Sequence, residues 1–314
     1  MQHSVDFEYD TAAVINIGGR ERQEDALATD FLAGSGFGFA VLADGMGGHV
    51  GGDIASRIVV TEVFTELKLR VGDSKQLEAE LQGALLQAAA GANACLSEYI
   101  ELNPALQGMG ATLLAPVLFS NRLYWISIGD SPLYLYRSGQ LSRLNADHSM
   151  AAEIDALVAK GRLSPNDAAE HPDRHCVTSV LSGTPVPRVD CRQVPVDLAE
   201  GDILLAASDG LLTLSEMEIA SVLATERNQS SARIGTALMH QLETMGQPEQ
   251  DNISICVIKP FESAAKTTDA ELALRKTKLS HSQQQRGRRI ITLLASVKHL
   301  PNSTPGSPEK GTSL

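Results

Sequence analysis

The chain has 314 residues, of which 43% are hydrophobic, and its formal net charge is −12 at pH 7. This length allows one large or two small domains with a full core, and the acidic balance argues against nonspecific binding of nucleic acid or an anionic membrane by the body. No apolar run reaches the roughly 18 residues of a membrane span, and the N-terminus, MQHSVDFEYD, is polar and unlike a signal peptide. We therefore expect a cytoplasmic protein.

The predicted elements begin with strands and turns over 12–43. Two long helices follow, the first capped by Asp53, the second with an apolar face from Leu77 to Tyr99 and an end before Asn103-Pro104. Further along, Ser164 begins a helix within a mainly helical patch over 148–170. The remaining predicted elements are strands over 111–118, 122–128, 132–136, 191–196, 203–208 and 253–259, and helices over 215–224 and 231–245. Grouped strands and paired helices, without strict alternation, predict an α+β fold.

Four cysteines are present, Cys95, Cys176, Cys191 and Cys256, and none forms a CxxC pair. Their apolar surroundings predict free, buried thiols rather than disulfides or zinc ligands. His175-Cys176 resembles the start of the HCxxxxxR loop of tyrosine phosphatases, but Ser182 stands where the arginine should be. Without that guanidinium a phosphate has no bidentate partner, so a cysteine nucleophile is rejected.

The composition changes near residue 261. Residues 262–314 hold nine Lys and Arg against four Asp and Glu, which leaves a net charge of −17 on residues 1–261. We place a folded domain at 6–261 and a basic, largely disordered tail at 262–314. Apolar residues recur at helical spacing over 287–300, among basic ones. This pattern predicts either a linker with a helix-prone patch or an amphipathic helix that docks on the acidic body, a partner or a membrane surface.

Five acidic sites share one trait, because each lies at the edge of a strand-like run. They are Glu24-Asp25, Asp44, Asp130, Asp209 and Asp251. A single Asp at a strand end is more often a turn former, but five such sites, two of them followed by glycine, indicate side chains aimed into one cleft. Mg²⁺ and Mn²⁺ prefer such oxygen ligands, and a cation offsets the cost of gathering like charges.

The loop after Asp44 is rich in glycine, with Gly45, Gly47, Gly48, Gly51 and Gly52 in eight residues. Glycine suits positions where the backbone needs positive φ or must approach another group closely. The sequence therefore predicts that this loop lies close to a metal cluster, with the Gly45 carbonyl free to turn toward it.

These residues carry a resemblance to a known family. The strings that carry it, in chain order, are Arg20-x-x-x-Glu24-Asp25, Asp44-Gly45-Met46-Gly47-Gly48-His49, Met109-Gly110-Ala111-Thr112, Gly129-Asp130-Ser131, Asp147-His148-Ser149, Ser208-Asp209-Gly210 and Asp251-Asn252. Together they resemble the PPM-type (type 2C) metal-dependent Ser/Thr protein phosphatases in their bacterial form, over residues 12–260. The resemblance implies two packed antiparallel sheets flanked by pairs of helices.

The resemblance also implies roles for the matched residues. Asp44 bridges two Mn²⁺ or Mg²⁺ ions. Asp209 and Asp251 complete the shell of one ion, and Asp25 with the Gly45 carbonyl serves the other. A hydroxide that bridges the two ions then attacks the phosphorus of phosphoserine or phosphothreonine.

Further roles lie around this core. Glu24 holds a water of the metal site, Arg20 clamps the substrate phosphate, and Asp130 helps to bind a third ion. The segment over about 149–187 corresponds to a flap beside the active site. His49 is either a histidine that stabilises its loop or a general acid.

The chain departs from the family pattern at several positions. Gln23 replaces an asparagine, and Pro132 stands where an arginine usually follows Gly-Asp-Ser, which removes a cation near the site. The usual Thr-Arg-x-Leu-Gly after the flap reads Thr178-Ser-Val-Leu-Ser. These changes concern the flap and substrate preference rather than the core carboxylates.

The implied partners are phosphorylated proteins, including a cognate Ser/Thr kinase or its substrates, and we expect a monomer that binds no nucleic acid. One alternative is a catalytically weak pseudophosphatase that binds phosphoproteins, since fold does not guarantee activity. A second is a metallonuclease, which the acidic body disfavours.

Overall fold

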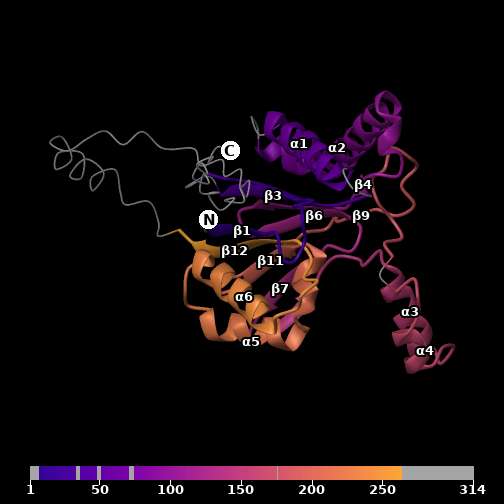
Figure 1. Ribbon diagram of the computed structural model, residues 1–314. Coiled ribbons are helices and arrows are strands. Elements are labelled where there is room, and N and C mark those ends of the chain that lie inside the picture. The colour runs from indigo at the N-terminus through magenta and orange to yellow at the C-terminus, as the bar shows by residue number, and fades with distance from the viewer. Residues whose placement is uncertain (1–6, 33–35, 48–50, 71–73, 175, 264–314) are drawn as a thin grey trace, which may run out of the picture.

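The computed structural model describes residues 7–32, 36–47, 51–70, 74–174 and 176–263. Within this part of the chain, two antiparallel sheets stack face to face and each is covered by a pair of helices on its outer side (Figure 1). The predicted α+β sandwich is confirmed.

The first sheet has the strand order β1-β12-β11-β7-β8. Its strands are β1 (Phe7–Asn16), β7 (Leu133–Arg137), β8 (Gln140–Arg143), β11 (Ile203–Ala207) and β12 (Ile253–Glu262). The helices α5 (Glu216–Glu226) and α6 (Ser231–Met245) cover its outer face.

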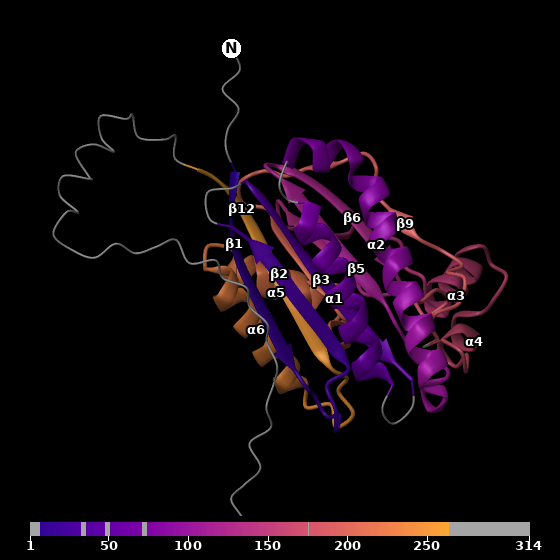
Figure 2. The same cartoon turned by 90° about the horizontal axis from the view of Figure 1, so that it is seen from above.

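The second sheet follows the order β10-β6-β5-β3-β2, with β4 paired to β3 and β9 paired to β6. Its strands are β2 (Asp25–Phe31), β3 (Phe37–Met46), β4 (Gly110–Ala111), β5 (Leu113–Phe119), β6 (Arg122–Ile128), β9 (Asp190–Cys191) and β10 (Val196–Asp197). The long helices α1 (Gly52–Arg70) and α2 (Ser74–Leu102) lie over this sheet, as the view from above shows (Figure 2). No helix among the described residues combines the length and apolarity that a membrane crossing needs.

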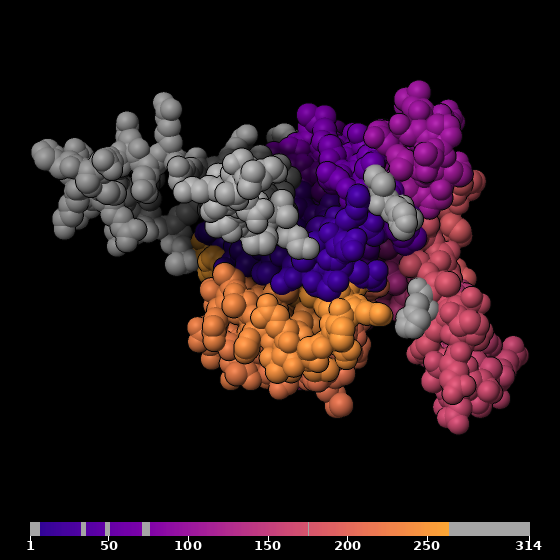
Figure 3. Space-filling view, viewed as in Figure 1, coloured from indigo at the N-terminus to yellow at the C-terminus, as the bar shows by residue number. Residues whose placement is uncertain are grey.

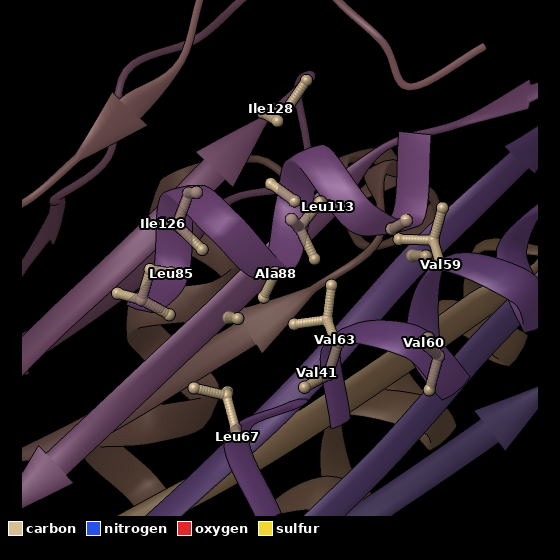
Figure 4. Close-up of a cluster of buried hydrophobic side chains, with 14 of the residues drawn as sticks. Val41, Val59, Val60, Val63, Leu67, Leu85, Ala88, Leu113, Ile126 and Ile128 are labelled. Carbon is tan, nitrogen blue, oxygen red and sulfur yellow. The ribbon is translucent and has the colours of Figure 1, made fainter. Parts of the chain in front are cut away.

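Both faces of the central strands are buried, and alternate residues feed different layers. On β3, Val41 packs toward α1 and α2, whereas its neighbour Leu42 packs between the two sheets. Figure 4 shows the outer layer, in which Val63 of α1 and Leu85 of α2 lie with strand residues of the sheet. This double burial explains why the strands read as nearly continuous apolar runs rather than as alternating ones.

The helix ends follow local sequence rules. Ser164 accepts a hydrogen bond from the Asp167 amide at 3.1 Å, which confirms the predicted start of α4 (Pro165–Ala169). Ser215 and Glu218 form a reciprocal capping box at α5, and α6 ends at Gly246 in the left-handed conformation, with φ 62°.

The predicted flap contains α3 (Met150–Ala159) and α4, and these helices form an arm that projects from the sandwich (Figures 1 and 3). The arm is tied by ion pairs such as Arg174–Asp155 at 2.8 Å. After the arm, Leu181 returns to the body and pairs with Ala111 through two backbone hydrogen bonds.

Four sequence-based expectations differ from the structure. Asp53 was expected to cap the first long helix, but α1 begins at Gly52 and Asp53 lies within its first turn. The strand predicted over 191–196 is two short strands, because Pro195 lacks an amide and the six residues 191–196 lie opposite only four residues of β6, 123–126. The hairpin strand β8 was not predicted, since its sequence QLSR has no apolar run; it forms through a turn with positive φ at Ser138 and Gly139. At the end of α2, Ile100 is buried whereas Tyr99 is 37% exposed.

The cysteine prediction is partly wrong. All four thiols are free, as expected, but Cys256 alone of them is buried, and Cys176 is exposed beyond the flap arm. The exposure of Cys176 follows from its place in an irregular segment between α4 and the returning chain. The tail helix predicted over 287–300 and His49 lie outside the described residues.

Candidate metal centre

Two acidic residues face each other on neighbouring strands of the second sheet. Asp25 is the first residue of β2 and Asp44 lies near the end of β3, and the register of the two strands places them directly opposite. Residues opposite each other in an antiparallel pair project to the same face. The strand pairing therefore brings these two carboxyl groups together.

The first sheet brings two more carboxyl groups to the same end of the sandwich. Asp209 lies two residues after the end of β11, at the start of the 3-10 turn η2 (Asp209–Thr213), and Asp251 lies two residues before the start of β12. Because β11 and β12 are antiparallel neighbours, the end of one strand meets the start of the other. Ser208 joins the two sheets, since its hydroxyl donates to Asp25 Oδ2 at 2.7 Å.

Asp130 reaches the cluster from the connection between β6 and β7, where the chain crosses from one sheet to the other. Its carboxyl group interacts electrostatically with Asp209 and Asp44. Five predicted carboxylates thus gather from five separate chain segments. Any two of the five are at least nineteen residues apart in sequence, and Glu24 joins the cluster as the neighbour of Asp25.

Burial and mutual repulsion perturb these groups strongly. Burial, with the nearby charges of Asp209 and Asp251, raises the pKa of Asp25 to about 7. Burial and the neighbouring carboxylates Asp25 and Asp209 raise the pKa of Asp44 well above its usual range. Burial also raises the pKa of Asp209, and burial with the charge of Asp209 raises the pKa of Asp130 to about 7.

The carboxyl groups also act directly on one another. The contact between the Asp44 and Asp209 side chains raises the pKa of Asp44 and favours the ionised form of Asp209. Oδ1 of Asp25 and Oδ1 of Asp209 are buried and have no hydrogen-bond partner. A buried carboxylate oxygen without a partner costs free energy unless a cation or proton compensates it.

The donor set therefore fits hard divalent cations, which prefer carboxylate oxygens. As they stand, no three His, Cys, Asp or Glu side chains of the described residues are gathered tightly enough to hold a metal ion. The carboxyl groups of Asp25 and Asp251 instead accept hydrogen bonds from Ser208 and Arg20. A bound cation would favour the ionised form of Asp44, whose pKa burial raises.

Arg20 lies at the open side of the cluster. Its guanidinium donates to Asp251 Oδ2 at 2.7 Å, and the two side chains are 55% and 40% exposed. Asn252 holds the loop that carries Arg20, because its side-chain Nδ2 donates to the carbonyls of Ile17 and Arg22. Because an exposed ion pair contributes little, Arg20 is free to exchange Asp251 for an anionic ligand.

Glu24 and Gly45 lie next to each other beside Asp25 and Asp44. The Gly45 amide donates to the Glu24 carbonyl at 3.1 Å, and the Glu24 amide donates to Asn252 Oδ1 at 2.7 Å. Burial, followed by the charge of Asp53, raises the pKa of Glu24. This half-buried carboxyl group faces the same acidic cluster.

The structure gives a different reason for the glycine at position 45. Gly45 is not among the glycines with positive φ. A Cβ at this position would, however, lie 2.0 Å from the Gly52 carbonyl oxygen. A Cβ at Gly52 would in turn lie 2.7 Å from the Gly45 oxygen and 2.8 Å from Glu24 Cδ. Close packing of two backbones explains this pair of glycines, whereas Gly47 does have positive φ, at 130°.

Sequence reasoning missed several residues that hold the cluster in place. Thr112 accepts from the Asp44 amide at 2.9 Å and bonds Ser131 at 3.0 Å, although the motif around it was noted for another reason. Arg143, on β8, contacts the Asp130 carbonyl and Asp147 and was not singled out at all. The one hint in the sequence was that Arg143 stands four residues before Asp147. That spacing predicts an ion pair only within a helix, and Arg143 lies at the end of a strand.

The fold and this acidic cluster define a class of protein with an αββα sandwich and a carboxylate site at one end of the sheets. The chain matches the protein phosphatase 2C family over residues 16–253. It therefore belongs to that family, and the predicted resemblance is confirmed.

Individual relatives agree with this assignment. The chain is 36% identical over 171 residues to the Ser/Thr protein phosphatase PstP of Mycobacterium tuberculosis. The aligned region covers 54% of this chain and 31% of the relative, so the match spans about a third of that protein's length. A Ser/Thr phosphatase structure from S. agalactiae superposes with a TM-score of 0.69 at 28% identity, over 80% of this chain and 99% of the other. The PstP catalytic domain in complex with two manganese ions gives a TM-score of 0.64 at 28% identity, over 82% and 100% of the two chains.

Proposed function

We propose that this chain is a metal-dependent Ser/Thr protein phosphatase. The observation that carries the proposal is the cluster of buried carboxylates with unpartnered oxygens at Asp25 and Asp209, in a chain of the protein phosphatase 2C family. The relatives named above are Ser/Thr phosphatases, and one is described with manganese. No feature of the described residues favours the pseudophosphatase alternative, since all the predicted core carboxylates are present.

Five residues are proposed as ligands for two Mn²⁺ or Mg²⁺ ions. Asp44 is the shared ligand, Asp209 and Asp251 belong to one ion, and Asp25 and the Gly45 carbonyl belong to the other. When bound, two such cations lower the pKa of water to near neutrality and act as Lewis acids toward a phosphoryl group. Ionisation of Asp44, whose pKa is raised by burial and by the neighbouring carboxylates, is the change that this chain must undergo to accept them.

Three further residues act on the substrate side. Arg20 is proposed to leave Asp251 and bind the phosphate, because a guanidinium matches phosphate geometry. Glu24 accepts a hydrogen bond from a water molecule in the site and so orients it. Asp130 contributes to a third, more weakly held cation. The flap over 149–187 is proposed to contact the protein substrate, since its arm projects beside the body.

The substrates are proposed to be phosphoserine and phosphothreonine proteins, including a cognate kinase or its targets. The acidic body is not suited to a nucleic-acid substrate. We further propose that the protein acts as a monomer in the cytoplasm, with residues 262–314 as a tail that the chemistry does not need.

The test is hydrolysis of p-nitrophenyl phosphate and of a phosphothreonine peptide by the full chain with Mn²⁺, with and without EDTA. We expect turnover that depends on Mn²⁺ and is abolished by EDTA. Asp209→Asn is the matched inactive control. Tight binding of the phosphopeptide by the wild-type chain without phosphate release would contradict the proposal and favour the binding alternative.

A further inference from the structure

The backbone segment 129–132, which carries Asp130, is fixed by hydrogen bonds to all of its carbonyl oxygens. Each of the four consecutive carbonyl oxygens of 129–132 accepts a hydrogen bond. The donors are the His148 amide at 3.1 Å, Arg143 Nη2 at 2.6 Å, Asn145 Nδ2 at 2.9 Å and the Ala207 amide at 3.1 Å, in order along the segment. Three of these donors come from the short stretch 143–148, so that stretch positions the Asp130 backbone.

Arg143 is the only charged group among those donors. Besides a longer contact from its Nε to Asn145 Oδ1 at 3.5 Å, it makes two short contacts at once. Its Nη2 donates to the Asp130 carbonyl and its Nη1 donates to Asp147 Oδ2, both at 2.6 Å. Its side chain is 17% exposed, and Asp147 is 29% exposed. A planar guanidinium that bridges a carbonyl and a carboxylate fixes both in orientation, which a water molecule or a lysine does less well.

The cation on Arg143 also has an electrostatic role. Asp130, Asp147 and Asp209 place three carboxyl groups in one region, and Arg143 interacts with Asp130 and donates to Asp147. Pro132, which follows Gly129-Asp130-Ser131, carries neither a charge nor a donor. The positive charge beside Asp130 comes instead from Arg143.

We propose that Arg143 is a positioning residue that orients Asp130 and thereby sets the affinity of the cation that Asp130 serves. It supplies from β8 the positive charge that position 132 lacks. This inference rests on the proposed function for the role of Asp130, but the orientation of the 129–132 backbone does not depend on it.

A matched control exists in the same hairpin. Arg137 on β7 also binds a carboxylate, Asp202, through two nitrogens, and its side chain is 43% exposed. It lies at the other end of β7 from Asp130, and among its described contacts none is a residue of the acidic cluster. Arg137→Gln therefore removes a comparable ion pair without touching the Asp130 segment.

The first measurement is Mn²⁺ binding to the full chain by titration calorimetry. We expect Arg143→Gln to weaken the weakest-bound Mn²⁺ about 10-fold, while Arg137→Gln leaves every Mn²⁺ affinity within twofold of wild type. In an Asp130→Ala background, Arg143→Gln should cause no further loss, because the two residues act as one unit. Unchanged Mn²⁺ affinity in Arg143→Gln, or a loss that simply adds to that of Asp130→Ala, would overturn the proposal.

The second measurement needs no metal. In EDTA, amide hydrogen exchange of the peptide covering 129–133 should be about 10-fold faster in Arg143→Gln than in wild type, and unchanged in Arg137→Gln. Equal exchange rates in Arg143→Gln and wild type would refute the positioning role even if the chain bound no Mn²⁺. A wild-type chain that binds no Mn²⁺, with faster exchange in Arg143→Gln, would instead contradict the proposed metal centre. Should Arg143→Gln not fold, Arg143→Lys replaces it with the same expected directions, since a lysine keeps the charge but not the two-pronged contact.

Discussion

The interior of the sandwich and the acidic end of its sheets follow opposite rules. Between the sheets, Leu42, Leu114 and Leu204 are fully buried among other apolar side chains. At one end of the sheets, Asp25 is buried with an oxygen that has no partner, and burial beside Asp25 and Asp209 raises the pKa of Asp44. The apolar interior therefore supplies the stability that gathering these carboxyl groups consumes.

The largest expected effect comes from removing a core carboxylate. Asp44→Asn or Asp209→Asn should lower kcat/KM for p-nitrophenyl phosphate about 10³-fold or more, roughly 4 kcal/mol of transition-state stabilisation. In EDTA the same variants should be more stable than wild type, by about 2–4 °C in Tm, because they remove a buried repulsive charge. Steady-state kinetics at saturating Mn²⁺ and thermal unfolding in EDTA measure the two effects.

Asp202→Asn is the control for this prediction. Asp202 is 2% exposed and so is buried like Asp25, but Arg137 pairs with it through two hydrogen bonds. We expect a loss of about 1–3 kcal/mol in stability and unchanged turnover per folded molecule. Near wild-type activity in Asp209→Asn would show that the acidic cluster is not the active site.

The pH dependence of stability should separate the metal-free from the loaded protein. The folded-state pKa of Asp25 and of Asp130 is raised from 3.8 to about 7. Above pH 4 the unfolded state therefore binds fewer protons than the folded state, and the stability present below pH 4 is lost as the pH rises toward 7. In EDTA we expect Tm to fall by several degrees between pH 5.5 and pH 8.

Bound cations should cancel that trend. With excess Mn²⁺ the carboxylates are ionised and compensated, so Tm between pH 5.5 and pH 8 should stay level or rise. Calorimetry at several pH values checks both curves. A Tm in EDTA that rises from pH 5.5 to pH 8 would mean that ionisation of these buried carboxyl groups does not destabilise the folded protein.

Arg20 provides a smaller and more specific effect. Arg20→Ala should raise KM and the inhibition constant of free phosphate together, by about 10-fold, or roughly 1.4 kcal/mol. Its stability should change little, because the ion pair with Asp251 is exposed. Arg233→Ala is the matched control, since Arg233 is 60% exposed and pairs with Glu226 away from the site. Inhibition by phosphate that stays equal to wild type would show that Arg20 does not bind the phosphate.

The smallest effect is expected from removal of the tail. Strand β12 runs to Glu262, and the Ser263 hydroxyl donates to Glu8 at 2.6 Å, so a stop after Ser263 keeps every described contact of the body. We expect turnover of p-nitrophenyl phosphate within about twofold of the full chain, because all proposed ligands precede residue 252. Loss of activity in a folded fragment would extend the catalytic domain into residues 264–314.

Sequence patterns alone determined much of this protein. The apolar runs and helical spacings located most of the strands and all of the long helices, because burial imposes those periods locally. Motif order assigned the family and picked out the acidic residues, since a divalent cation requires oxygen ligands whatever the fold.

The tertiary structure decided the rest. Strand register placed Asp25 opposite Asp44, and the crossing between sheets brought Asp130 and Asp209 to them; no spacing in the sequence encodes such a meeting of distant segments. Burial then determined which carboxyl groups have a raised pKa. The close packing of Gly45 on Gly52 determined that neither position has room for a side chain. Arg143 shows the same limit, because its partner Asp130 is thirteen residues away and is reached only through the β7–β8 hairpin.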